Sequence, residues 1–266
     1  MTAAVVVLAA RADLGAAAVA RALAGRLGGD RVLPLSPTEL ARARWSHRVS
    51  AAGLTTTRLT LPDGRVLTDT DTAAVLHRLP PLPVLGLGRA SAKDLDYARA
   101  ELHALVASWL LGLGPRVLGQ VSSYGTAHGP FSPTAALVHA ERCGLPVARS
   151  GGATRGGLLP AAVGGELRLP RLAWPGGAGA PVPVEIRPEP GAERLLFCGT
   201  RPVGLLAERY GERLHRLAGL LGTRLFELRL RPDGAVTDVD PCPPLATAEQ
   251  RAAVTDELVA LTRSGS

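Results

Sequence analysis

The sequence predicts an α/β fold in which a parallel sheet near the N-terminus is followed by an α+β region. An apolar run at 5–8, an alanine-rich segment at 14–27 and a second apolar run at 31–35 form a strand–helix–strand unit, with Asp13 as the helix N-cap. Such a unit favours neighbouring parallel strands. Near the C-terminus, two runs of alternating apolar residues flank the turn Pro232-Asp233-Gly234 and predict a β-hairpin.

Further strands and helices are expected between these two regions. Ser132 and Pro133 provide the N-cap and the first residue of a helix that ends at Gly144. The other expected elements are a hairpin at 54–67, a strand or short helix at 73–79, helices at 94–111, 210–221 and 248–261, strands at 166–169 and 182–186, and a hairpin at 194–206.

Composition limits the class of protein. The 266 residues are 46% hydrophobic but only 3% aromatic, so the core is built from Leu, Val and Ala. No apolar run reaches the roughly 18 residues of a membrane span, and the first residues lack the basic opening of a signal peptide. Cys143, Cys198 and Cys242 are isolated, as expected of reduced thiols. We therefore expect a cytoplasmic protein with no membrane partner.

The net charge of +7 raises the question of nucleic-acid binding. Lys93 is the only lysine among the 30 basic residues, and the arginines are spread from Arg11 to Arg263 without a dense run. Aromatic residues are scarce and no nucleic-acid-binding motif is visible. A basic nucleic-acid-binding protein is therefore only the third hypothesis for the function.

The second strand of the C-terminal hairpin carries two carboxylates. Asp238 and Asp240 are two residues apart, so their side chains point to the same side of a strand. Hard cations such as Mg²⁺ take oxygen ligands. The hairpin is therefore the candidate metal site, with Asp238, Asp240 and Glu227 of the first strand as the predicted ligands.

Several segments, in the correct order, resemble those of the ATP-grasp superfamily. Asp238-Val239-Asp240-Pro241 resembles the strand that ends in Glu-x-Asn-Pro. The segment 139–147, with its Gly-Leu-Pro-Val step, resembles the entry into the nucleotide-binding domain. The stretch 193–199 resembles the strand whose arginine lies near the nucleotide phosphates, with Arg194 in that position. The chain is most similar to the ATP-grasp proteins that modify ribosomally made peptides.

The resemblance implies a domain organisation and a set of ligands. It implies a pre-ATP-grasp-like parallel-sheet domain at 1–125, a linking helix and shortened small lobe at 126–190, and an ATP-grasp-like α+β lobe at 191–266. ATP and Mg²⁺ are the implied cofactors, with Arg194 and Arg155 beside the phosphates. A precursor peptide or a partner enzyme is the implied partner, and a homodimer is left open.

Two features depart from the ATP-grasp pattern. ATP-grasp ligases form an acyl phosphate, which needs cations along the triphosphate, usually two lysines of the small lobe. Here the segment 149–190 contains no lysine, and arginines such as Arg155 are not equivalent replacements. In the hairpin, Arg229 stands where an acidic ligand is expected, so its guanidinium would repel Mg²⁺ and pair with Asp238 or Asp240.

The form of the turn decides which residues of the hairpin face each other. A two-residue Asp233-Gly234 turn places Arg229 opposite Asp238, and Glu227 opposite Asp240. A three-residue loop shifts the register by one and turns Asp238 toward the face of Leu228. Three interpretations stay open: a salt bridge in place of a metal, a solvated strand face, and a retained Mg²⁺ site.

The leading hypothesis for the function is a degenerate ATP-grasp-like protein, a pseudoenzyme that does not ligate. It would bind a peptide, a small substrate or a partner enzyme in a peptide-modifying biosynthetic pathway. The alternative is an active ATP- and Mg²⁺-dependent carboxylate–amine ligase that acts on a peptide or a small molecule, with arginines in place of lysines.

Overall fold

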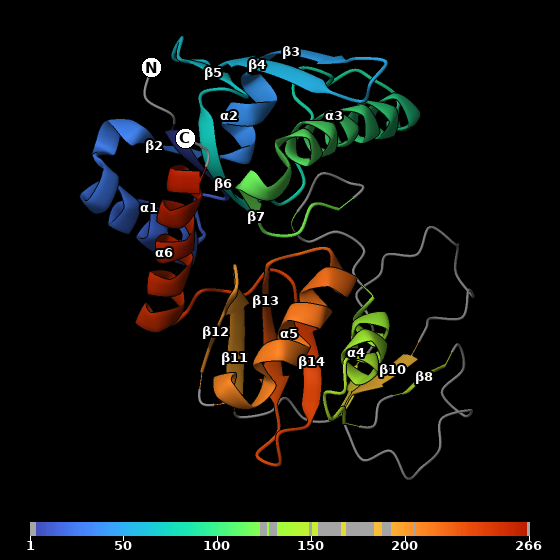
Figure 1. The fold of residues 1–266 in the computed structure, drawn as a ribbon. Coiled ribbons are helices and arrows are strands. Elements are labelled where there is room, and N and C mark those ends of the chain that lie inside the picture. Colours follow the sequence, from blue (N-terminus) through green and yellow to red (C-terminus); the bar gives the residue numbers. More distant parts are fainter. Residues whose placement is uncertain are drawn as a thin grey trace.

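The structure of the chain is a computed structural model. It describes residues 4–122, 127, 132–148, 151–153, 166–168, 184–187, 193–204 and 206–264. Its two larger sheets lie side by side, the first built near the N-terminus and the second near the C-terminus (Figure 1).

The N-terminal sheet is parallel, as the strand–helix–strand unit predicts. Its order is β2-β1-β6-β7, with the strands listed at the end of this paragraph. Helix α1 (Leu14–Leu27) begins where expected, because the Asp13 side chain accepts a hydrogen bond from the Ala16 amide. The strands are β1 (Ala4–Ala9), β2 (Val32–Leu35), β6 (Thr72–Arg78) and β7 (Val117–Leu118).

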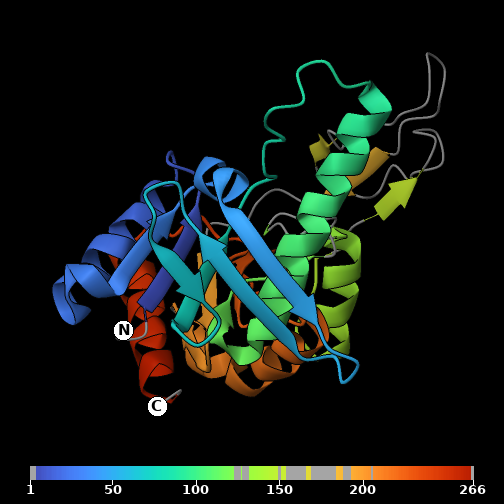
Figure 2. The same ribbon diagram turned by 90° about the horizontal axis from the view of Figure 1, so that it is seen from above.

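Each face of this sheet has its own core, because alternate residues of a strand point to opposite sides. Helices α1 and α6 (Ala248–Ser264) cover one face, where Val5 and Val7 are buried. Helices α2 (Pro37–Arg42) and α3 (Ala92–Leu113) cover the other face, where Val6 and Leu8 are buried. A small antiparallel sheet, β3-β4-β5, lies over α3 on the outside (Figures 1 and 2).

The small sheet contains both a confirmed prediction and a missed strand. The hairpin of β4 (Thr55–Thr60) and β5 (Val66–Thr68) is confirmed. Strand β3 (Arg44–Val49), which pairs with β4, was not predicted from the sequence, and neither was α2 on the N-terminal sheet. A capping box between Ser36 and Glu39 starts α2 and was the available signal. No helix among the described residues is long and apolar enough to cross a membrane.

The C-terminal sheet is antiparallel, with the order β12-β11-β13-β14. Helices α4 (Pro133–Arg142) and α5 (Ala207–Leu221) cover one face, where Phe197 and Phe226 stack with their ring centroids 5.1 Å apart. The hairpins predicted at 194–206 and around Pro232-Asp233-Gly234, and the helices predicted at 132–144 and 210–221, are thereby confirmed. The strands are β11 (Glu193–Cys198), β12 (Arg201–Val203), β13 (Leu225–Leu230) and β14 (Val236–Asp240).

A third antiparallel sheet has the order β8-β10-β9. The strands are β8 (Gly151–Ala153), β9 (Glu166–Arg168) and β10 (Val184–Arg187), so the strands predicted at 166–169 and 182–186 are confirmed over their described residues. Arg155 lies outside the described residues. The division of the chain into the regions 1–125, 126–190 and 191–266 stays a prediction.

After β14 the chain returns to the N-terminal sheet, where α6 packs against α1. Gly15 of α1 makes a close approach there, since a Cβ atom on it would lie 2.5 Å from the carbonyl oxygen of Pro244. The segment between β14 and α6 therefore crosses directly over the start of α1, which connects the C-terminal hairpin to the N-terminal sheet.

Candidate functional site

The hairpin of β13 and β14 combines the two alternatives for its turn. Gly234 has a φ of 86°, and the amide of Arg231 donates to the carbonyl of Ala235 (2.9 Å), which is the three-residue loop. A bulge at Thr237 then shifts the register between the pairs Leu230–Val236 and Arg229–Asp238. The bulge restores the register expected of the shorter turn, so Arg229 lies opposite Asp238.

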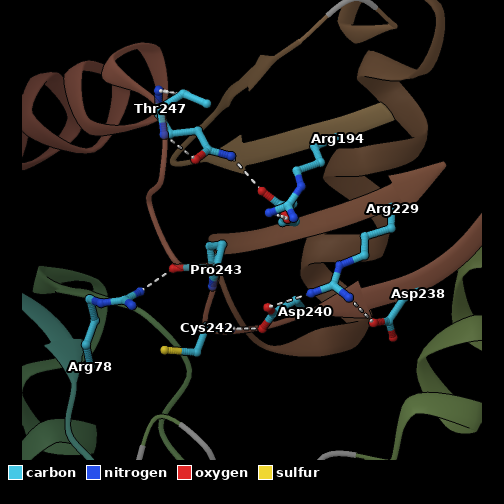
Figure 3. A network of polar contacts seen from close by, with 10 residues as sticks. Arg78, Arg194, Arg229, Asp238, Asp240, Cys242, Pro243 and Thr247 are labelled. Carbon is cyan, nitrogen blue, oxygen red and sulfur yellow. Dashed lines mark hydrogen bonds and ion pairs between the residues drawn. The ribbon is translucent and has the colours of Figure 1, made fainter. Parts of the chain in front are cut away.

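Arg229 lies between the two aspartates of β14 (Figure 3). One guanidinium nitrogen is 3.6 Å from Asp238 Oδ2 and the other is 3.9 Å from Asp240 Oδ2. All three side chains are about one fifth to one quarter exposed, at 25%, 18% and 25%. These distances are those of ion pairs rather than of hydrogen bonds. The cation therefore offsets one of the two carboxylate charges without being tightly bound to either carboxylate.

Glu227 of β13 lies opposite Asp240 on the same face of the sheet and is completely buried. Its Oε1 is 3.2 Å from a guanidinium nitrogen of Arg194 on β11, and its Oε2 accepts a hydrogen bond from Gln250 (2.6 Å). Burial raises the pKa of Glu227, while Arg194 and the hydrogen bond from Gln250 act in the opposite direction. The buried carboxylate is thus held by one cation and one amide.

The start of α6 orients the Gln250 amide. The amide of Thr247 donates to Gln250 Oε1 (3.2 Å), and the amide of Gln250 donates to Thr247 Oγ1 (3.1 Å), which is a capping box. With its oxygen used in the cap, Gln250 presents its NH₂ group to Glu227. Gln250 was not predicted as a site residue, although its spacing of three residues from Thr247 is the signal of a capping box.

The remaining carboxylate oxygens also have partners. Asp240 Oδ1 accepts a hydrogen bond from the Cys242 amide (2.9 Å), and Asp238 Oδ1 accepts one from the Val239 amide (3.0 Å). Every oxygen of the three carboxylates therefore faces a donor or a cation. In this arrangement the residues do not fit a divalent cation, and the described part of the chain holds no group of three or more side chains placed to ligate a metal ion.

The loop after Asp240 is tied to the N-terminal sheet by Arg78. This arginine ends β6, is 5% exposed, and was missed by the sequence analysis. Its Nη1 donates to the carbonyl of Pro243 (2.5 Å), and its Nε donates to Asp13 Oδ2 (2.6 Å). Asp13, predicted only as a helix cap, therefore also holds Arg78, whose contact with Pro243 positions this loop. Figure 3 shows the contact of Arg78 with Pro243.

The structure thus brings together four of the five predicted site residues. Arg194, Glu227, Asp238 and Asp240 lie on one face of neighbouring strands, with Arg229 among them. The opposite face of the same strands is apolar and packs against α4 and α5. In this arrangement the charged side chains form ion pairs with one another.

Comparison with known proteins identifies the fold. No protein-family model and no curated protein matches the chain. Among solved structures, the macrocyclase MdnB from Microcystis aeruginosa has a TM-score of 0.67 at 12% identity, covering 98% of both chains. The ATP-grasp ligase PsnB, in complex with precursor peptide PsnA2 and AMPPNP, has a TM-score of 0.67 at 17% identity, again over 98% of both chains.

A third solved structure is similar over nearly the whole chain. It is a RiPP-associated ATP-grasp ligase from Chryseobacterium gregarium in complex with ADP and a leader and core peptide, with a TM-score of 0.61 at 12% identity over 97% of both chains. These likenesses show that the chain has the ATP-grasp ligase fold, so the fold expected from the resemblance is confirmed.

Proposed function

We propose that this protein is a non-ligating component of a peptide-modifying biosynthetic pathway, where it binds a precursor peptide. The observation that carries the proposal is the position of Arg229 between Asp238 and Asp240. On this proposal its guanidinium takes the place of a metal ion. A ligase that makes an acyl phosphate needs cations, including Mg²⁺, in contact with the triphosphate. A cation that is part of the hairpin cannot bridge the phosphates as Mg²⁺ does.

The surroundings of the hairpin support the same interpretation. Arg194, which by resemblance would face the nucleotide phosphates, instead forms an ion pair with the buried Glu227. The absence of lysine from the segment 149–190 removes the usual second source of positive charge. Both features reduce the attraction of the site for a triphosphate with its metal ion.

The peptide as partner is inferred from the solved structures of this fold. PsnB and the ligase from Chryseobacterium gregarium both form complexes with precursor or leader peptides. A chain that has this fold but lacks the charges for ligation can still bind such a peptide and present it to another enzyme.

The second candidate is an active ATP- and Mg²⁺-dependent carboxylate–amine ligase. It is favoured by the complexes of PsnB with Mg and ADP and by the presence of carboxylates in this hairpin. In this case Arg229 would leave the aspartates when the nucleotide binds, and Glu227, Asp238 and Asp240 would hold the metal. Arginines of the small lobe, such as Arg155, would contact the phosphates.

Isothermal titration calorimetry with ATP and Mg²⁺ separates the two candidates. We expect no binding in the micromolar range for the wild-type protein. Micromolar binding that is lost in Asp240→Ala, and kept in the matched surface variant Asp96→Ala, would instead establish the ligase. A labelled peptide encoded beside the gene should bind equally well with and without ATP, and a requirement for nucleotide would also contradict the proposal.

A further inference from the structure

The outer face of the small sheet β3-β4-β5 carries three arginines. Arg44, Ser46 and Arg48 alternate with Trp45 and His47 along β3, and Arg58 of β4 lies opposite Ser46. Arg44, Arg48 and Arg58 are all exposed. Because residues opposite each other share a face, the three guanidinium groups project from the same side of the sheet.

The inner residues of β3 are held by α3. The Trp45 ring meets Trp109 edge-to-face with the centroids 5.5 Å apart, and His47 Nε2 is 2.8 Å from Ser108 Oγ. This packing determines which side of β3 faces out, so the arginine face cannot turn toward the core. Figure 2 shows the sheet lying over α3 with its outer face uncovered by other described elements.

The charges of this face are not neutralised within the described part of the chain. None of the described carboxylates forms an ion pair with Arg44, Arg48 or Arg58, and strands β3, β4 and β5 contain no acidic residue. Other surface arginines do pair: Arg65 with Asp63, and Arg99 with Asp96. Arg44, Arg48 and Arg58 therefore form a local group of positive charge on one face of the small sheet.

Strand β3 is also an edge of its sheet. It pairs with β4 on one side only, and its other side makes no backbone pairing with the described residues. An edge strand offers a row of amide and carbonyl groups to an added extended segment. Side chains of such a segment alternate between the two faces, so every second one would lie beside the arginines.

We propose that the edge of β3 and the arginine face together bind an acidic polypeptide segment in extended conformation, with carboxylates at alternate positions. The segment pairs with β3 through the backbone, and its carboxylates contact Arg44 and Arg48. Arg58, one strand further away, attracts the segment at a distance within the screening length. This surface is separate from the hairpin of Arg229, so its test requires neither nucleotide nor precursor peptide.

The probe is a fluorescein-labelled peptide of about ten residues in which Glu alternates with Thr, measured by fluorescence anisotropy at low salt. Its control has the same composition, with the Glu residues in one block. We expect the alternating peptide to bind more tightly than the blocked peptide. Equal affinities, or no binding of the alternating peptide, would overturn the proposal.

The variant Arg44→Glu/Arg48→Glu should weaken binding of the alternating peptide about tenfold. The matched variant Arg21→Glu/Arg142→Glu makes the same change in net charge at exposed positions of α1 and α4 and should change it less than about twofold. Equal losses of peptide affinity in the two variants would show that only the net charge of the protein matters and would overturn the proposal. Tighter binding of polyuridylate RNA than of either peptide, lost in Arg44→Glu/Arg48→Glu, would also overturn the proposal.

Both substituted positions on β3 are exposed, so the variant should fold, and its thermal unfolding midpoint checks this. The milder variant Arg44→Gln/Arg48→Gln removes the charge without reversing it. It should lose affinity about threefold, and an affinity unchanged from wild type would count against a role for these arginines.

Discussion

Two arginines of this protein face carboxylates on either side of the loop at 241–243, and they do so in different ways. Arg78 is 5% exposed and donates hydrogen bonds at 2.6 and 2.5 Å to Asp13 and to the carbonyl of Pro243. Arg229 is 25% exposed and stays 3.6 and 3.9 Å from its two aspartates. The first arginine is held by directed bonds, and the second by charge alone.

The difference indicates separate roles. A buried, directed pair joins two parts of a structure, because removing either partner leaves an unpaired charge in the interior. A loose, partly exposed cation between two carboxylates balances charge and retains freedom to move. Arg78 therefore joins the N-terminal sheet to the loop beyond β14, while Arg229 sets the charge of the candidate site.

Arg78→Ala tests the first role and should have the largest effect. It leaves Asp13 charged and largely buried and the Pro243 carbonyl without its donor, so we expect a loss of about 3 kcal/mol in the free energy of unfolding. Urea denaturation measures it. The exposed pair of Arg26 and Asp256 provides the control, since Arg26→Ala should cost less than about 0.5 kcal/mol. Equal small losses of unfolding free energy in both variants would show that Arg78 does not join the N-terminal sheet to the loop beyond β14.

Arg229→Asp tests the second role. It places a third carboxylate beside Asp238 and Asp240 and should lower stability by about 2 kcal/mol in the absence of divalent cations. Excess Mg²⁺ should restore part of this loss in the variant and leave the wild-type protein unchanged. Thermal unfolding with and without Mg²⁺ gives both readings.

The control for Arg229→Asp is Arg231→Asp, which makes the same charge change at an exposed pair in the same hairpin. It should shift the unfolding midpoint far less. A midpoint of Arg229→Asp equal to that of wild type would show that Arg229, Asp238 and Asp240 are only a solvated strand face.

Glu227→Gln sharpens the comparison through pH and should have the smallest effect. Burial raises the pKa of Glu227 above its ordinary value of 4.5, so the folded chain holds this proton more strongly than the unfolded chain. The stability linked to this proton is fully present below 4.5 and is lost as pH rises through the raised pKa. The variant lacks this loss.

The stability of Glu227→Gln relative to wild type should therefore increase as pH rises above 4.5. Urea denaturation over a pH series measures this slope, and Glu249→Gln, an exposed position at the start of α6, serves as the control. A slope with the opposite sign would mean that Arg194 and Gln250 outweigh burial and lower the pKa of Glu227.

Local patterns predicted much of the fold and part of the site. Asp13 and Ser132 were recognised as helix caps, because a cap depends on residues within one turn. The alternation around Pro232-Asp233-Gly234 located the hairpin and its carboxylates. Strand β3 was not predicted, because Arg44, Ser46 and Arg48 separate its few apolar residues. Only its packing on α3 shows why polar and apolar residues alternate there.

By itself the sequence determined the strand–helix–strand unit near the N-terminus, the place of the C-terminal hairpin and the excess of arginine over lysine. These depend on neighbours in the chain and on composition. Only the tertiary structure decided that a bulge at Thr237 sets Arg229 opposite Asp238, and that Arg78 reaches a carbonyl 165 residues away. The physical reason is that register and long-range pairing depend on how whole faces pack, which no local pattern encodes.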